Sequence, residues 1–117
     1  MRYLMLIRLD PAIAPVAGPD PALQADMGAL IEEMTKAGVL LDTAGLRPME
    51  EATRIRLSGG AQTVLDGPFT ESKEIIGGYC LLQARSKEEA VEWGSRFLRV
   101  HGPEWTMELE IRELDQS

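Results

Sequence analysis

The order of strand-like and helix-like segments constrains the fold of this 117-residue chain more than any other feature. Two segments with the apolar spacing of helices stand among runs that show the two-residue alternation of β-strands. We expect strands at residues 2–9, 39–46, 53–58, 62–66, 75–84 and 106–112, and helices at residues 21–37 and 87–101. Without the hairpin this order is βαββαβ, the ferredoxin-like pattern, in which both helices cover one face of an antiparallel sheet in an α+β domain.

Residues with specific terminal roles mark the boundaries of these segments. Asp20-Pro21 is typical of an N-cap followed by the first helical residue, and Gly38 fits a C-terminal stop. The second helix opens with Ser86-Lys87-Glu88-Glu89, which fits a capping box. Gly59-Gly60 suits a tight hairpin turn, and Gly77-Gly78 inside a strand indicates a bulge or a close approach by another group.

Length and composition exclude several classes of protein. The chain fits one domain, residues 1–117, that can form a core without a disulfide or a metal. Its formal net charge of −7 argues against nucleic-acid binding, because phosphate backbones require clustered Lys and Arg. No apolar run approaches the ~20 residues that span a bilayer, and the start lacks a signal-peptide pattern. We therefore expect a cytoplasmic protein that is not bound to a membrane.

The single cysteine and the single histidine limit the possible chemistry. Cys80 lies in an apolar run and is expected to behave as a small buried hydrophobic residue. With His101 as the only histidine, neither a His-rich nor a Cys/His metal site is expected. No phosphate loop, dinucleotide-binding glycine motif or nucleophile elbow occurs, so no cofactor is expected either.

One face of the expected sheet is left uncovered by the helices. It carries Leu4, Leu6, part of the apolar run 75–82, and the charged residues Arg2, Arg8, Arg54, Arg56, Arg112, Glu108 and Glu110. An apolar strip bordered by charge is typical of an interface or a ligand cleft. We expect a homodimer that closes sheet on sheet around a cavity. The alternative is that these charges simply pair across strands on a solvated surface.

The segment Asp66-Gly67-Pro68-Phe69-Thr70-Glu71-Ser72-Lys73-Glu74 places a turn, an aromatic ring and charged groups between two expected strands. It resembles the DGPFAETKE signature of the YCII-related (YciI-like) proteins, with Thr70 and Ser72 as the two differences. Four other segments match the places where such proteins have them: Met1-Arg2-Tyr3-Leu4, Lys36-Ala37-Gly38-Val39, Gly77-Gly78-Tyr79 and Glu110-Ile111-Arg112. The resemblance therefore extends over almost the whole chain.

This resemblance implies a ferredoxin-like fold of the dimeric α/β-barrel type, with dimerisation through the sheets. It also implies a functional link to an extracytoplasmic-function sigma factor, because such proteins are often encoded beside one. Some YCII relatives are regarded as lyases that use a His–Asp pair, with the histidine just after the first strand. This chain has Asp10-Pro11 there, so only Asp66 corresponds to a member of that pair.

Each candidate site residue also has an ordinary structural role open to it. Asp66 is a candidate general base or ligand acceptor, or the first residue of an Asx turn. Histidine is the side-chain type suited to proton exchange near neutral pH, which makes His101 the best acid–base candidate; alternatively it packs at a helix end. Phe69, Lys73 and Glu74 are candidate ligand contacts, or a packing anchor and solvated charges.

Two functions of different classes follow. The first is a dimeric small-molecule-binding or regulatory protein, with an anionic or aromatic ligand held by Arg8, Arg112 and Lys73 near Asp66. The second is a cofactor-free lyase-type enzyme, with Asp66 or His101 as the base and an arginine that stabilises developing negative charge. The absence of an early histidine favours the binding protein.

Overall fold

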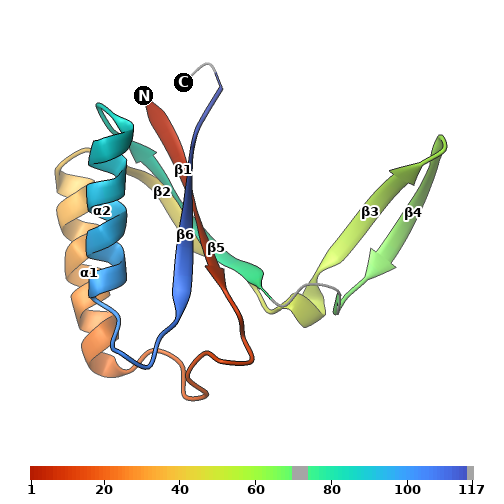
Figure 1. Cartoon of the computed structure of the whole chain (residues 1–117), viewed down its shortest axis with the longest axis horizontal. Coiled ribbons are helices and arrows are strands. Elements are labelled where there is room, and N and C mark those ends of the chain that lie inside the picture. The colour runs from red at the N-terminus through yellow and green to blue at the C-terminus, as the bar shows by residue number, and fades with distance from the viewer. Residues whose placement is uncertain (70–73, 116–117) are drawn as a thin grey trace.

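The computed structural model describes residues 1–69 and 74–115, and it has the expected ferredoxin-like α+β architecture (Figure 1). Its main sheet contains β1 (Arg2–Leu9), β2 (Leu40–Gly45), β5 (Ile75–Gln83) and β6 (Met107–Glu113) in the order β2-β5-β1-β6, with antiparallel neighbours throughout. The helices α1 (Pro21–Lys36) and α2 (Lys87–Arg99) lie side by side on one face of this sheet. Neither helix is long and apolar enough to cross a bilayer, nor is any other in the part of the chain that the structure describes.

The core forms where the helices meet the sheet. Alternate residues of β1 and β5 face the helices and are buried with residues of α1 and α2: Tyr3, Met5, Cys80, Leu82, Leu30, Met34, Ala90 and Phe97. The Cys80 thiol is buried, as expected, and burial raises its pKa. Its Sγ lies 3.3 Å from the hydroxyl oxygen of Thr43 on the neighbouring strand.

The other residues of these strands form the side of the sheet away from the helices, here called the open face. Because directly opposite residues in an antiparallel pair share a face, the strand register assigns its members. They are Leu4, Leu6 and Arg8 of β1, Ile76, Tyr79 and Leu81 of β5, and Glu108, Glu110 and Arg112 of β6. This matches the apolar and charged surface that the sequence predicts, except that Arg54 and Arg56 lie on the separate hairpin.

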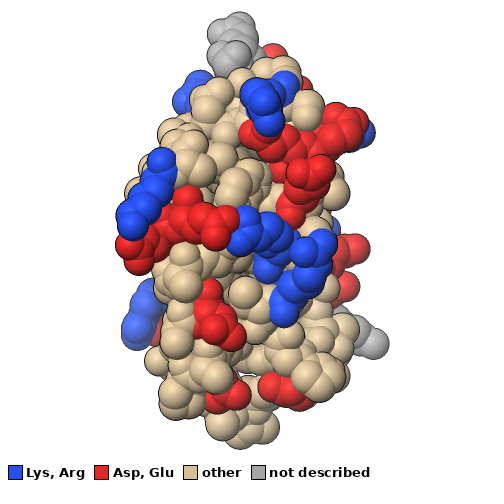
Figure 2. All heavy atoms as spheres, turned by 90° about the vertical axis from the view of Figure 1, so that its left-hand side faces the viewer, with Lys and Arg blue, Asp and Glu red and all other residues tan. Residues whose placement is uncertain are grey.

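The helix side of the molecule carries its charges in pairs. Figure 2 shows basic side chains next to acidic ones in the upper and middle parts of this surface, and close pairs join Arg96 to Glu33 and Lys36 to Glu32. The Arg96 hydrogen bond lowers the pKa of the Glu33 carboxyl. Some of the charges on the outer surface of the helices are thus neutralised locally.

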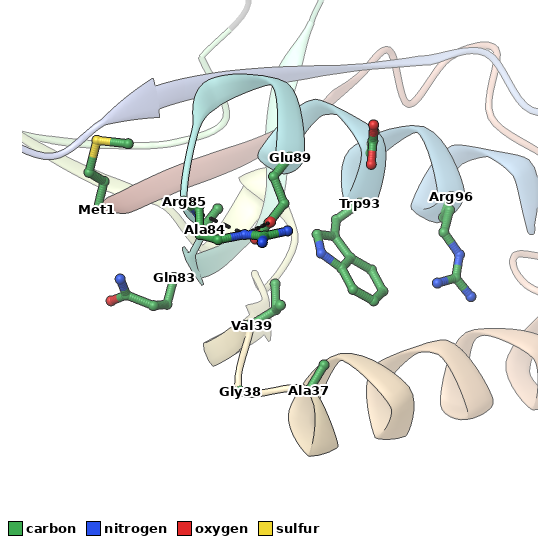
Figure 3. Close-up of a pocket in the computed structure, with 11 residues that line it drawn as sticks. Met1, Ala37, Gly38, Val39, Gln83, Ala84, Arg85, Glu89, Trp93 and Arg96 are labelled. Atoms are coloured by element: carbon green, nitrogen blue, oxygen red, sulfur yellow. Dashed lines mark hydrogen bonds and ion pairs between the residues drawn. The ribbon is translucent and has the colours of Figure 1, made fainter.

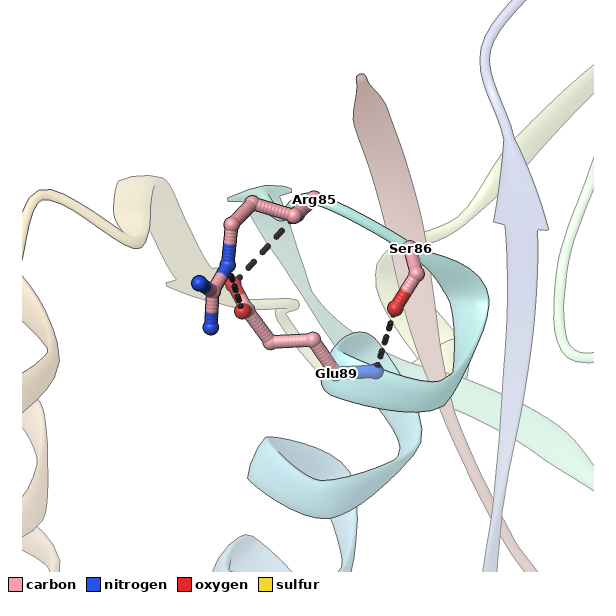
Figure 4. Close-up of polar contacts among 3 residues, drawn as sticks. All are labelled: Arg85, Ser86 and Glu89. Carbon is pink, nitrogen blue, oxygen red and sulfur yellow. Dashed lines mark hydrogen bonds and ion pairs between the residues drawn. The ribbon is translucent and has the colours of Figure 1, made fainter.

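The helix ends confirm the predicted caps. The Asp20 carboxylate accepts a hydrogen bond from the Leu23 N–H at 2.8 Å, and Gly38 has a φ of +75° just beyond the end of α1. At α2 the Ser86 hydroxyl accepts from the Glu89 N–H at 3.1 Å (Figure 4). The Glu89 carboxylate reaches one residue further back than in a standard capping box, because it accepts from the backbone N–H and the Nε of Arg85.

The inserted hairpin stands apart from the main sheet. Its strands β3 (Thr53–Ser58) and β4 (Ala61–Asp66) pair only with each other, around a turn in which Gly59 and Gly60 have positive φ. Figure 1 shows this hairpin projecting on the side of the sheet that the helices leave open. The molecule consequently measures 46 × 40 × 18 Å.

A tight crossing at the base of the hairpin requires a glycine. The short 3₁₀ helix η1 (Met49–Glu51) leads into β3, and the Gly67 N–H donates to the Ala52 carbonyl at 2.7 Å. A Cβ on Gly67 would lie 2.6 Å from the Met49 carbonyl oxygen and 3.1 Å from that of Ala52. Both neighbours are backbone atoms, so the conflict cannot be relieved by turning a side chain.

We predict that Ser86→Ala lowers the free energy of unfolding by about 1 kcal/mol, because the Glu89 N–H loses its acceptor. Ser95→Ala in the same helix is the matched control. Its hydroxyl accepts a bond only from the exposed Arg99 side chain, so its loss should change stability by less than about 0.5 kcal/mol. Urea unfolding followed by tryptophan fluorescence measures both. Equal losses in the two variants would contradict the capping role.

We also predict that Gly67→Ala destabilises the protein by about 1–3 kcal/mol, the usual cost of overpacking at a site that cannot yield. Gly28→Ala is the control, because nothing lies within 4 Å of a Cβ at that position of α1. It should raise stability by about 0.5–1 kcal/mol through better helix propensity. Thermal unfolding of the pair tests the prediction, which fails if Gly67→Ala is as stable as the parent.

Candidate ligand-binding site

A pocket of about 520 Å³ opens on the open face, where the base of the hairpin meets the sheet. Strands β1, β5 and β6 supply most of its wall, and the rest comes from η1, from β3 and from the residues just after β2 and just before β5. It is lined by Leu6, Arg8, Leu46, Met49, Arg54, Glu74, Ile75, Ile76, Glu110 and Arg112. Apolar side chains with a few convergent charged groups are the usual composition of a small-molecule site.

A bulge in β5 brings an isoleucine into this pocket. Ile7 lies opposite Gly78 and Arg8 lies opposite Ile76, so Gly77 is the extra residue of the pair. Since side chains alternate along a strand, the extra residue turns Ile76 to the same face as Arg8. A Cβ on Gly78 would lie 2.8 Å from the Ala44 carbonyl oxygen. The two glycines therefore serve the bulge and the close approach that the sequence indicates.

Arg8 lies in the pocket wall with its charge already compensated. Its Nη1 donates to Glu110 Oε1 at 2.8 Å, and its Nε lies 3.6 Å from Glu74 Oε2. The Glu110 hydrogen bond is the main cause that raises the pKa of the Arg8 guanidinium. Arg8 and Glu74, two of the predicted ligand contacts, are thus partners of each other in this structure.

Arg112, a third predicted contact, is in a different electrostatic position. It comes from β6, opposite Leu4 of β1, and it is exposed at the pocket wall. Across residues 1–69 and 74–115 its guanidinium forms no ion pair and no hydrogen bond. It is therefore placed to pair with an anion that enters the pocket.

Phe69 acts on the pocket through a neighbour. The guanidinium of Arg54 lies 3.8 Å from the centroid of the Phe69 ring, a close cation–π contact. Arg54 is one of the residues that line the pocket, whereas Phe69 is not. The sequence places Arg54 among the charges of the uncovered face but does not assign it to the site. In the hairpin Arg54 lies opposite Leu65, the residue before Asp66. This strand pairing is the signal that links Arg54 to the segment 66–74.

The two acid–base candidates lie apart from this pocket and from each other. Asp66 Oδ1 accepts a hydrogen bond from the Thr53 hydroxyl at 3.1 Å across the hairpin. His101 follows α2 on the helix side, where its Nδ1 lies 3.1 Å from the Phe97 carbonyl oxygen and its ring contacts Trp105 edge-on. Neither side chain lines this pocket or the larger one described below. Lys73, the remaining candidate, lies outside the described residues.

A second pocket, of about 600 Å³, lies between the end of α1, the start of β2 and α2 (Figure 3). The sequence gives no sign of it, because its walls come from helix exits and strand ends far apart in the chain. Its two arginines are both engaged. Arg85 pairs with Glu89 at 2.7 Å, and Arg96 pairs with Glu33 and lies 4.9 Å from the Trp93 ring centroid. Because both arginines are already paired, this pocket is less suited to binding an anion than the pocket beside Arg112.

Comparison with known proteins identifies the family of this chain. Residues 1–102 match the model of the YCII-related domain. The chain is also 35% identical over 95 residues to an uncharacterized protein of Rhizobium meliloti (strain 1021). The aligned residues make up 81% of this chain and 75% of that protein. The family match includes the segment 66–74 and ends before β6, the strand that carries Glu110 and Arg112. The chain belongs to the YCII-related family.

Proposed function

We propose that this protein is a dimeric small-molecule-binding or regulatory protein, and that an anionic ligand binds in the pocket of the open face. The observation that carries this proposal is the Arg112 guanidinium, which stands at the pocket wall without an ionic partner in the described chain. A carboxylate or phenolate beside it gains a charge-assisted hydrogen bond.

The charge of the pocket wall supports an anion over a cation. The wall contains three arginines and two glutamates, so its formal charge is +1 in a protein whose net charge is −7. Both glutamates lie against Arg8, whereas Arg112 forms no ion pair with any residue that the structure describes. Negative ligands are thereby drawn to this part of an otherwise acidic surface.

The apolar part of the pocket supports a ligand with a hydrophobic body. Leu46 and Ile76 line it and remain 52% and 46% exposed, and Leu6 lies beside them. An aromatic or branched aliphatic group covering these side chains would remove apolar surface from water, at about 25 cal/mol for each Å². An aromatic carboxylate or a phenolate has both the charge and the body that this wall requires.

The dimer in this proposal joins the open faces of two copies. Leu4, Leu6, Tyr79 and Leu81 form an apolar strip with no layer over it, and antiparallel sheets bury such strips by packing face to face. Two sheets so packed would exclude water from the pocket and strengthen its charged contacts. The family resemblance points to the same dimer. From that resemblance we also propose a functional link to an extracytoplasmic-function sigma factor and a cytoplasmic location.

The geometry supports binding better than elimination chemistry. A base and an acid that act on one substrate must both reach one point of a cavity. Asp66 is bonded to Thr53 in the hairpin, and His101 is bonded to a carbonyl at the end of α2 on the other side of the sheet. The described residues therefore provide charged recognition without a paired proton donor and acceptor.

We predict that benzoate or a substituted phenolate stabilises the protein against heat, and that Arg112→Gln weakens this binding roughly tenfold or more, since a hydrogen bond to a charged group contributes about 1.5–3 kcal/mol. At one hundred times the dissociation constant the parent should gain about 2.7 kcal/mol. Arg99→Gln, on the helix side and bonded to Ser95, is the matched loss of one charge and should bind normally. Calorimetric titration of all three proteins measures the affinities.

Two results would contradict the ligand proposal. One is that no small carboxylate or phenolate shifts the unfolding temperature. The other is that Arg112→Gln and Arg99→Gln weaken binding equally, which would indicate a general effect of charge instead of a contact in the pocket.

We further predict that the protein is a dimer at micromolar concentration and that Leu6→Lys makes it monomeric, because a lysine would be buried against the apolar strip of the partner. Val91→Lys is the control: Val91 lies on α2, 49% exposed, and the variant should remain dimeric. Light scattering coupled to gel filtration gives the masses, and circular dichroism verifies folding. A monomeric parent protein would refute the sheet-on-sheet dimer.

A further inference from the structure

The hairpin β3–β4 has an apolar face against which none of the residues that the structure describes is packed. Ile55 lies opposite Val64, and Leu57 follows two residues after Ile55, so all three side chains share one face. They are 70%, 65% and 70% exposed, respectively. The hairpin pairs with no other strand, and two-stranded hairpins are marginally stable in water by themselves. We therefore expect this apolar face to be covered by a surface that does not belong to the hairpin.

A second copy of the chain offers a surface that matches it. The open face also lacks a covering layer, and the hairpin projects on that same side of the sheet (Figure 1). In a two-fold symmetric dimer every contact occurs twice. One dimer can thus cover both hairpins and both open faces, whereas an unrelated partner would have to cover each surface separately.

Charge favours the same occupant. Residues 53–66 contain Arg54, Arg56 and Asp66, so the hairpin has a formal charge of +1. Because the net charge of the chain is −7, the remaining 103 residues have a formal charge of −8. The Arg56 side chain is exposed and forms no ion pair with any described residue. The open face itself carries three acidic and three basic side chains: Asp42, Glu108, Glu110, Arg2, Arg8 and Arg112. The hairpin is consequently attracted by the net negative charge of a second copy, while the balanced charges of the open face do not oppose its apolar contact.

We propose that the hairpin is a dimerisation arm, which packs Ile55, Leu57 and Val64 on the open face of a second copy beside its ligand pocket. This inference rests on the dimer proposed above and names the segment that holds it together. The arm also bears on the pocket, because Met49 and Arg54 line the pocket at the base of the hairpin. An arm held by the partner fixes that wall of its own pocket.

The test places the photoreactive residue p-benzoylphenylalanine at position 57 and irradiates a mixture of ¹⁵N-labelled and unlabelled protein. We expect a covalent dimer whose mixed-isotope peptides join residues 53–66 of one copy to β1 or β5 of the other. The same photoreactive residue at position 91 on α2 is the control and should give no such product. Peptide mass spectrometry identifies the joined segments.

A double variant gives an independent measurement. Ile55→Ser with Leu57→Ser should raise the dimer dissociation constant roughly tenfold or more, because two apolar anchors are lost from the interface. Both side chains are largely exposed in the single chain, so the folded monomer should keep its circular dichroism spectrum. Analytical ultracentrifugation measures the dissociation constant.

The possible outcomes distinguish the role of the hairpin as a dimerisation arm from the existence of the sheet-on-sheet dimer. A stable dimer in which position 57 links only within its own chain, or in which the double variant associates as tightly as the parent, would refute the arm and leave the sheet-on-sheet dimer standing. Links that join the two hairpins to each other would refute the open face as the surface the arm occupies. A monomeric parent protein would refute both.

Discussion

The pairing of β1 with two neighbours is the interaction on which the rest of this structure depends. Its N-terminal half sends Tyr3 and Met5 into the helix-covered core, and the alternate positions Leu6 and Arg8 go to the open face. Strand alternation thus makes eight residues serve both the stability of the fold and the wall of the pocket. A shift of one residue in this register would exchange the two sets and remove both the core and the site.

Local sequence signals predict most of the fold because they act over a few residues. The N-caps at Asp20 and Ser86, the glycine after α1 and the turn at Gly59-Gly60 all lie where the pattern places them. Strand ends differ by a residue or two, since a hydrogen-bonding ladder ends where its partner ends. The ferredoxin-like order follows from these segments, because few topologies accommodate two helices on one face of an antiparallel sheet.

The candidate site is less predictable, because its contacts join distant parts of the chain. Arg8 and Glu110 are separated by 102 positions, and only the β1–β6 register brings their side chains together. The sequence assigns Arg8 and Arg112 the same role, yet one is neutralised by two carboxylates and the other is not. Asp66 bonds to a side chain across the hairpin in place of an Asx turn, because strand pairing puts Thr53 opposite it.

The hairpin base lies within the residues that match the family model, whereas Arg112 lies outside them. The tight crossing at Gly67 and the Phe69–Arg54 contact lie within residues 1–102 and set the hairpin base against the sheet. Arg112 lies beyond that range, on an edge strand whose outward positions contribute nothing to the core. The constraint on these positions is therefore unequal. We expect a change at the hairpin base to disturb the fold, and a change at Arg112 to leave the fold intact. For the anion site proposed above, substitutions in β6 would accordingly alter the charge offered to a ligand while the motif keeps the same architecture.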